Sequence, residues 1–223
     1  MIIIPEQYHD VWNNLVRHYH LSERQQEQIW TFLNRLISEN EKYNLTAIVE
    51  LHKAIHDHVY DSLALLDIFD RLKATSIADI GSGGGFPGIP LAIALPDVRF
   101  TLVEVNLKKV AFLESVAADL GLTNVHVVSY DFRTFLRQFD KPIELFIARA
   151  SLEVDEILRI FKPSSQYQAS TFVYWASSKW VATGSLQKLY FDNCYPYSVE
   201  NKQRALCVFI KKENGSSKES LNN

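Results

Sequence analysis

The chain has 223 residues, of which 47% are hydrophobic and 22% are charged, and its formal net charge is −3. This length suits one well-buried domain with an appendage and is too short for two full domains. No apolar run reaches the roughly 18 to 20 residues of a membrane span, and the N-terminus lacks the pattern of a signal peptide. We therefore expect a cytoplasmic monomer without membrane contact, in which any RNA binding would need a local basic face.

The first 73 residues predict a helical N-terminal cap. Apolar residues recur at helical spacing in two early stretches, namely Tyr8, Trp12, Leu15 and Val16, and then Ile29, Leu33, Leu36 and Ile37. Ser22 and Gln25 have the spacing of a capping box, which predicts the start of the second helix. Residues 51–60 and 61–72 predict two further helical stretches, after a turn at 44–46.

Three histidines, His52, His56 and His58, follow closely in the third helical stretch and raise the possibility of zinc. We expect no metal, because no HExxH pattern or cysteine pair supplies the remaining ligands. We expect His58, Asp61 and Ser62 to form hydrogen bonds at a junction of the cap and the core, or to shape the floor of an active site.

From residue 74 the pattern changes to alternating strands and helices. Strands are predicted at 76–80, 100–104, 125–129 and 143–147, and helices at 89–95, 107–120 and 132–138. This succession predicts an α/β core over 74–212 with a doubly wound, mostly parallel sheet. A helix from 151 to about 160, a β-prone run at 171–175 and two late strands at 190–199 and 205–211 would complete seven strands, with an antiparallel edge and a flexible polar tail at 213–223.

The two cysteines, Cys194 and Cys207, lie in apolar, strand-like surroundings near the end of the core. They do not have the spacing of a metal site. We expect both to be buried and reduced.

The segment 79–88 contains five of the eight glycines and lies between a predicted strand and an apolar helix. Glycines at such a place let the backbone approach a ligand closely. Glu104 ends the next strand, where a carboxylate can accept hydrogen bonds from a ribose diol. The spacing of Gly81, Gly83 and Gly85, with Asp79 just before them, favours a cationic S-adenosylmethionine over NAD; a tight turn without a ligand is the alternative.

Several motifs together resemble one methyltransferase family. They are Asn44-Leu45-Thr46, His58 with Asp61-Ser62-Leu63, Asp79-Ile80-Gly81-Ser82-Gly83-Gly84-Gly85-Phe86-Pro87-Gly88-Ile89-Pro90-Leu91, Lys108-Lys109 with Phe112-Leu113, and Arg149-Ala150. Over about residues 10–212 the chain is similar to the bacterial small-subunit rRNA methyltransferase G family, also called glucose-inhibited division protein B. The resemblance implies a class I, Rossmann-like methyltransferase that uses S-adenosyl-L-methionine to methylate a guanine N7 in 16S rRNA of the 30S subunit, with S-adenosyl-L-homocysteine as product.

These observations give a set of candidate site residues. The expected cofactor-binding residues are Asp79, Gly81, Ser82, Gly83, Gly85, Phe86, Glu104, Asp131, Phe132 and Arg149. Arg149 is also the catalytic candidate, because it ends a strand at the carboxyl edge of the sheet and its guanidinium can hold a phosphate or stack on a base. For Arg149 the alternative is an ion pair within the fold. Lys108, Lys109 and Arg133 are the candidates for RNA contact, and a solvated helix face is the alternative for the two lysines.

The sequence departs from the family at Asp131-Phe132-Arg133, where the family usually has an arginine, a small residue and an acid. We expect Asp131 to accept from the adenine amino group with Phe132 beside the ring; the alternative is a helix N-cap. This departure keeps open a cofactor-binding module without catalysis. Two other functions also stay open: a methyltransferase of another RNA, protein or small molecule, and an NAD-dependent enzyme, which the glycine spacing disfavours.

Overall fold

The computed structural model describes most of the chain, namely residues 2–43, 50–149, 153, 156, 158–182, 187 and 190–211. The turn expected at 44–46, most of the helix expected from 151 and the tail expected at 213–223 lie outside the described residues. Across the part that is described, no helix combines the length and the apolar character needed to cross a bilayer.

The helices that precede the sheet confirm the expected helical stretches. They are η1 (Glu6–Tyr8), α1 (His9–Tyr19), α2 (Glu23–Tyr43), α3 (Leu51–Lys53), the π-helix η2 (Ala54–Tyr60), α4 (Asp61–Leu63) and α5 (Leu66–Leu72). The capping box at the start of α2 is present, because the Ser22 backbone N–H donates to Gln25 Oε1 at 2.9 Å and the Gln25 N–H donates to Ser22 Oγ at 3.4 Å.

The sheet has seven strands in the order β3-β2-β1-β4-β5-β7-β6. The strands are β1 (Ser76–Ile80), β2 (Arg99–Val103), β3 (Val125–Val128), β4 (Leu145–Arg149), β5 (Thr171–Ser177), β6 (Phe191–Val199) and β7 (Lys202–Phe209). β1 to β5 run parallel, and β7 is antiparallel to both β5 and β6. The crossover helices are α6 (Gly88–Ala94), α7 (Leu107–Asp119) and α8 (Phe132–Gln138). The predicted architecture is therefore confirmed.

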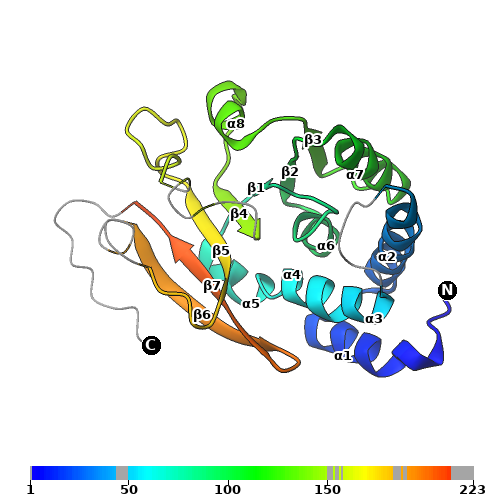
Figure 1. Cartoon of the computed structure of the whole chain (residues 1–223). Coiled ribbons are helices and arrows are strands. Elements are labelled where there is room, and N and C mark those ends of the chain that lie inside the picture. The colour runs from blue at the N-terminus through cyan, green and yellow to red at the C-terminus, as the bar shows by residue number, and fades with distance from the viewer. Residues whose placement is uncertain are drawn as a thin grey trace.

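Two hydrophobic clusters cover the two faces of this sheet. On one face, Ile77 and Ile147 pack with the N-terminal helices, α6 and α7, including Phe32 of α2. On the other face, Ala78 and Phe146 pack with α8 and the segment after β4. Figure 1 shows the N-terminal helices beside α6 and α7, with α8 apart from them. The N-terminal helices and the sheet share one hydrophobic cluster, so packing does not mark a boundary between them. The expected domain boundary at residue 73 stays a prediction.

The cysteines differ from the expectation. Cys194 of β6 and Cys207 of β7 are direct partners in the antiparallel register, and the structure joins them in a disulfide. Their Cα atoms are 4.1 Å apart. The expectation of two reduced thiols is thus wrong for this structure, because the hairpin register places side by side two residues whose environments were judged separately.

Candidate functional site

The glycine-rich loop connects β1 to α6 at the carboxyl edge of the sheet. Gly81, Gly83 and Gly85 have φ angles of 71°, 57° and 98°, a region that L side chains rarely adopt. At Gly88, a Cβ would lie 2.6 Å from Asp79 Oδ2, so only glycine lets the start of α6 approach this carboxylate. The loop geometry therefore explains the glycines at these positions.

Asp79 lies in β1 and is fully buried. Its Oδ2 accepts a hydrogen bond from the Gly88 N–H at 3.1 Å, whereas its Oδ1 is buried and has no hydrogen-bond partner among the described residues. Burial raises the pKa of Asp79 to about 7, against the opposing effects of the Ser82 hydroxyl and the Gly88 hydrogen bond. A buried carboxylate oxygen without a donor is costly in itself and fits the donor group of a cationic ligand.

Glu104 directly follows β2 and connects that strand to the glycine loop. Its Oε2 accepts from the Gly83 N–H at 2.9 Å, and its Oε1 accepts from the N–H groups of Val105 and Asn106, each at 2.9 Å. An ionised carboxylate has about four acceptor positions, so one remains for a ligand hydroxyl. Val105, which the sequence reasoning missed, is 66% exposed beside it and adds apolar surface at the same edge.

The segment after β3 begins with a helix N-cap, which is the alternative that the sequence left open for Asp131. Asp131 is the exposed N-cap of α8, and its carboxylate accepts from the Thr134 N–H at 3.0 Å and from Thr134 Oγ1 at 2.7 Å. Phe132 is buried in the hydrophobic cluster of α8. Arg133 forms two hydrogen bonds with Glu156, at 3.1 and 2.9 Å. Contacts of Asp131 or Phe132 with adenine, and of Arg133 with RNA, stay predictions.

Arg149, at the end of β4, is only 13% exposed and lies against residues of the helical cap. Its Nη1 donates to Asp61 Oδ2 at 3.0 Å, its Nη2 lies 2.9 Å from His58 Nδ1, and its guanidinium carbon is 5.4 Å from the centre of the Phe86 ring. Phe86 is itself buried and also packs against Phe32. His58 and Asp61 thus form the expected hydrogen bonds, both with Arg149, whereas Ser62 donates within the helix to the His58 carbonyl at 2.5 Å.

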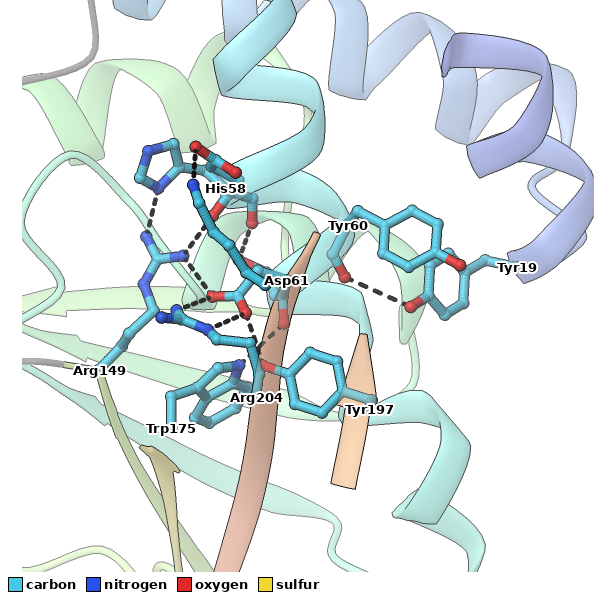
Figure 2. Close-up of polar contacts among 11 residues, drawn as sticks. Tyr19, His58, Tyr60, Asp61, Arg149, Trp175, Tyr197 and Arg204 are labelled. Carbon is cyan, nitrogen blue, oxygen red and sulfur yellow. Dashed lines mark hydrogen bonds and ion pairs between the residues drawn. The ribbon is translucent and has the colours of Figure 1, made fainter. Parts of the chain in front are cut away.

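Asp61 is the centre of this junction, and Figure 2 shows two arginines reaching it from different strands. Arg204 of β7 donates to both carboxylate oxygens at 3.1 and 2.9 Å, and Tyr197 of β6 donates to Oδ1 at 2.6 Å. The Trp175 indole N–H donates to the Asp61 carbonyl at 2.8 Å. Burial opposes ionisation, but the Arg204 hydrogen bonds and the charge of Arg149 together lower the pKa of Asp61.

Sequence reasoning missed Arg204, Tyr197 and Trp175 as parts of this cluster. They are 143, 136 and 114 residues away from Asp61 along the chain. A lone arginine beside the apolar run of β7 was the available signal, but nothing in the sequence indicated its partner.

Lys108 and Lys109 lie at the N-terminus of α7, four and five residues after Glu104. Asn106 caps this helix by accepting from both backbone N–H groups, at 3.0 and 3.4 Å. Within the described part of the chain, neither lysine side chain forms an ion pair, and Lys108 is exposed. Two unpaired cations near the positive end of a helix dipole favour an anionic partner.

The strand order, the single antiparallel strand inside the sheet, the glycine loop after β1 and the acid after β2 together define a class I methyltransferase fold. The family model for rRNA small subunit methyltransferase G matches residues 25–205. The chain therefore belongs to this family.

Curated relatives agree with this family. The ribosomal RNA small subunit methyltransferase G of Neisseria gonorrhoeae (strain NCCP11945) is 37% identical over 185 residues, which are 82% of this chain and 83% of the relative. That of Sorangium cellulosum is 55% identical over 97 residues, which span 43% of this chain and 41% of the relative. A solved structure of an MtNAS variant in complex with S-adenosylmethionine is similar in fold, with a TM-score of 0.56 and 14% identity over 93% of this chain and 80% of that one.

Proposed function

We propose that this protein transfers the methyl group of S-adenosyl-L-methionine to a guanine N7 in 16S rRNA of the small ribosomal subunit, acting as a cytoplasmic monomer. Membership of the family supports the reaction and the RNA substrate. The observation that carries the proposal is the buried Asp79 carboxylate, one oxygen of which has no partner in the described part of the chain, next to a glycine loop that is bonded to Glu104. This arrangement fits a ligand that brings a cationic donor group and a ribose.

The two acids beside the glycine loop would bind different parts of such a cofactor. Asp79 would accept from the cationic methionine end, directly or through water, and Glu104 would accept from a ribose hydroxyl at its remaining acceptor position. Gly81 and Gly83 have φ angles of 71° and 57°, so the loop can present backbone to such a ligand, whereas Gly85 packs against the core, where a Cβ would lie 2.9 Å from the Ile89 side chain. The bound cofactor would supply a methyl group that is already activated on a sulfonium.

Methylation at guanine N7 needs little acid-base chemistry from the protein. N7 has an in-plane lone pair and no proton, so the main requirements are orientation and tolerance of the charge that moves to the purine. Arg149 is placed at the same edge of the sheet as Asp79, because Ile147 of β4 pairs with Asp79 of β1. Lys108 and Lys109 would hold RNA phosphates at the neighbouring strand end.

The first test is methyl transfer from labelled S-adenosylmethionine to 30S subunits that lack this modification, followed by mapping of N7-methylguanine. We expect one mapped guanine with the unaltered protein, strongly reduced transfer with Asp79→Asn, and unaltered transfer with Asp97→Asn, which changes an exposed aspartate after α6. Cofactor binding without any transfer would instead support a non-catalytic module, and transfer to another acceptor would move the proposal to a different substrate.

Arg149 is tested by separating cofactor affinity from RNA methylation. Arg149→Ala leaves Asp61 bonded to Arg204 and Tyr197, so the junction keeps a counter-ion. We expect calorimetry to show nearly unchanged cofactor affinity and methyl-transfer assays to show at least about a tenfold lower kcat/KM for 30S subunits. Lost cofactor affinity with normal transfer at saturating cofactor would contradict the assignment.

A further inference from the structure

Two of the three clustered histidines lie close to a glutamate from the C-terminal part of the chain. His52 of α3, His56 of η2 and Glu200, in the turn between β6 and β7, present their ligand atoms within 4.8 Å of one another. His56 Nε2 lies 3.4 Å from Glu200 Oε1, and the two imidazole rings are 5.5 Å apart. We propose that these three residues form a binding site for a divalent transition-metal ion, namely Zn²⁺.

The spacing of the two histidines supports this proposal. They are four residues apart in a continuous helical stretch, which places both side chains on one face, as in helical two-histidine metal sites. His58 is excluded from the group, because its Nδ1 contacts Arg149. The structure thus separates the three histidines into a pair that faces the hairpin and a third that faces the candidate active site.

The chemistry of the donors selects the kind of ion. Two imidazole nitrogens and one carboxylate oxygen are a ligand set that zinc accepts, with water in the fourth position, whereas magnesium and calcium prefer oxygen ligands alone. The His56 ring is not fully engaged by the fold, since its Nδ1 is buried and lacks a hydrogen-bond partner among the described residues. The ligands are also accessible, because His52 and Glu200 are exposed.

The charges around the site are nearly balanced. Lys202 lies two residues after Glu200 and adds positive charge, but its Nζ is paired with Asp57 Oδ2 at 2.6 Å. That pair already connects η2 to the start of β7, so the metal would not need to bring the two segments together. The tip of the β6–β7 hairpin reaches the helical cap in Figure 1. A bound ion would add a further connection between the cap and the hairpin, beside those that Asp57 and Asp61 already make.

The experiment measures Zn²⁺ binding to the full, untagged chain by competition with a chromogenic chelator. We expect one equivalent to bind with a dissociation constant on the order of 1 μM or below, and an increased thermal midpoint, because the ion binds only the folded state. His52→Ala, His56→Ala and Glu200→Gln are each expected to weaken binding at least about tenfold.

Two matched variants serve as controls. His126→Ala changes an exposed histidine of β3, and Glu114→Gln changes an exposed glutamate of α7. Both are expected to bind Zn²⁺ as the unaltered chain does. Binding that is absent at 100 μM Zn²⁺, or that survives Glu200→Gln and His52→Ala unchanged, would overturn the proposal; NMR of the imidazole nitrogens checks that His52 and His56, and not His126, respond to the ion.

Discussion

Asp61 and Asp79 are two buried aspartates of the same protein with opposite surroundings. Asp61 is 1% exposed and accepts from two arginines and a tyrosine, and these donors lower its pKa although burial opposes them. Asp79 is fully buried; its Oδ2 accepts one hydrogen bond at 3.1 Å, its Oδ1 has no partner among the described residues, and burial raises its pKa to about 7.

The difference separates a structural carboxylate from a ligand-binding one. Once Asp61 is saturated by donors from three strands, it has no capacity left for a ligand, and its main effect is to hold the cap against the hairpin. Asp79 lacks such donors and keeps its capacity, at a cost to the cofactor-free fold. Four predictions test this comparison.

Asp61→Asn is expected to have the largest effect on stability. The substitution removes the negative charge between Arg149 and Arg204 and leaves two partly buried cations without a counter-ion, which we expect to lower the free energy of unfolding by about 3 kcal/mol. Urea unfolding measures this change. Asp70→Asn, at an exposed position of α5, is the control and should change it by less than about 0.5 kcal/mol.

Asp79→Asn, unlike Asp61→Asn, is not expected to lower the free energy of unfolding of the cofactor-free protein. Because the amide does not ionise, the cofactor-free fold loses the cost of a buried charge and should be as stable as the unaltered protein, or more stable, above pH 7. Its affinity for S-adenosylmethionine should fall by about 1–3 kcal/mol, which calorimetry measures. A destabilised fold with normal affinity would make Asp79 a structural residue like Asp61.

The pH dependence of stability sharpens the comparison through His58. Burial, together with the charge of Arg149, lowers the pKa of His58 to about 4, so between pH 6.5 and 4 the unfolded chain binds more protons and stability falls with falling pH. The raised pKa of Asp79 acts in the opposite direction between about pH 7 and 4. In Asp79→Asn the His58 contribution is unopposed, and we expect a loss on the order of 2 kcal/mol between pH 6.5 and 4.5.

This third prediction is measured by urea unfolding at several pH values without cofactor. The unaltered protein should show a smaller change over the same window than Asp79→Asn. If Asp79→Asn and the unaltered protein have the same pH profile, Asp79 does not carry a raised pKa, and its proposed contrast with Asp61 fails.

The smallest effect on the fold is expected from the surface lysines. Lys108→Ala combined with Lys109→Ala removes two side chains without an ion-pair partner in the described structure, so stability should change by less than about 0.5 kcal/mol. RNA affinity should fall, and the dependence of log K on log salt should become shallower by about 0.7 to 0.9 for each lost phosphate contact. Lys162→Ala is the control, and an unchanged salt slope for the double variant would remove both lysines from the RNA surface.

The sequence alone determined the order of the elements and the nucleotide-type loop. Alternating apolar runs predicted β1 to β4 within about two residues, because a buried parallel strand has a local composition that needs no knowledge of its neighbours. The glycines and the two acids at strand ends predicted the loop, since φ angles above zero and close backbone approach depend on the residue itself. Asp131 shows what the sequence could not decide. An acid directly after this strand suits both a helix N-cap and a contact with adenine, so its residue type does not distinguish the two roles.

Only the tertiary structure decided which distant side chains meet. Arg204 reaches Asp61 across 143 positions, Cys207 lies opposite Cys194 through the hairpin register, and Glu200 completes the histidine pair of the cap. These contacts depend on how β6 pairs with β7 and on how that hairpin packs against the N-terminal helices. Local patterns in a sequence do not contain such a distance, because it is set when remote segments bury the same core.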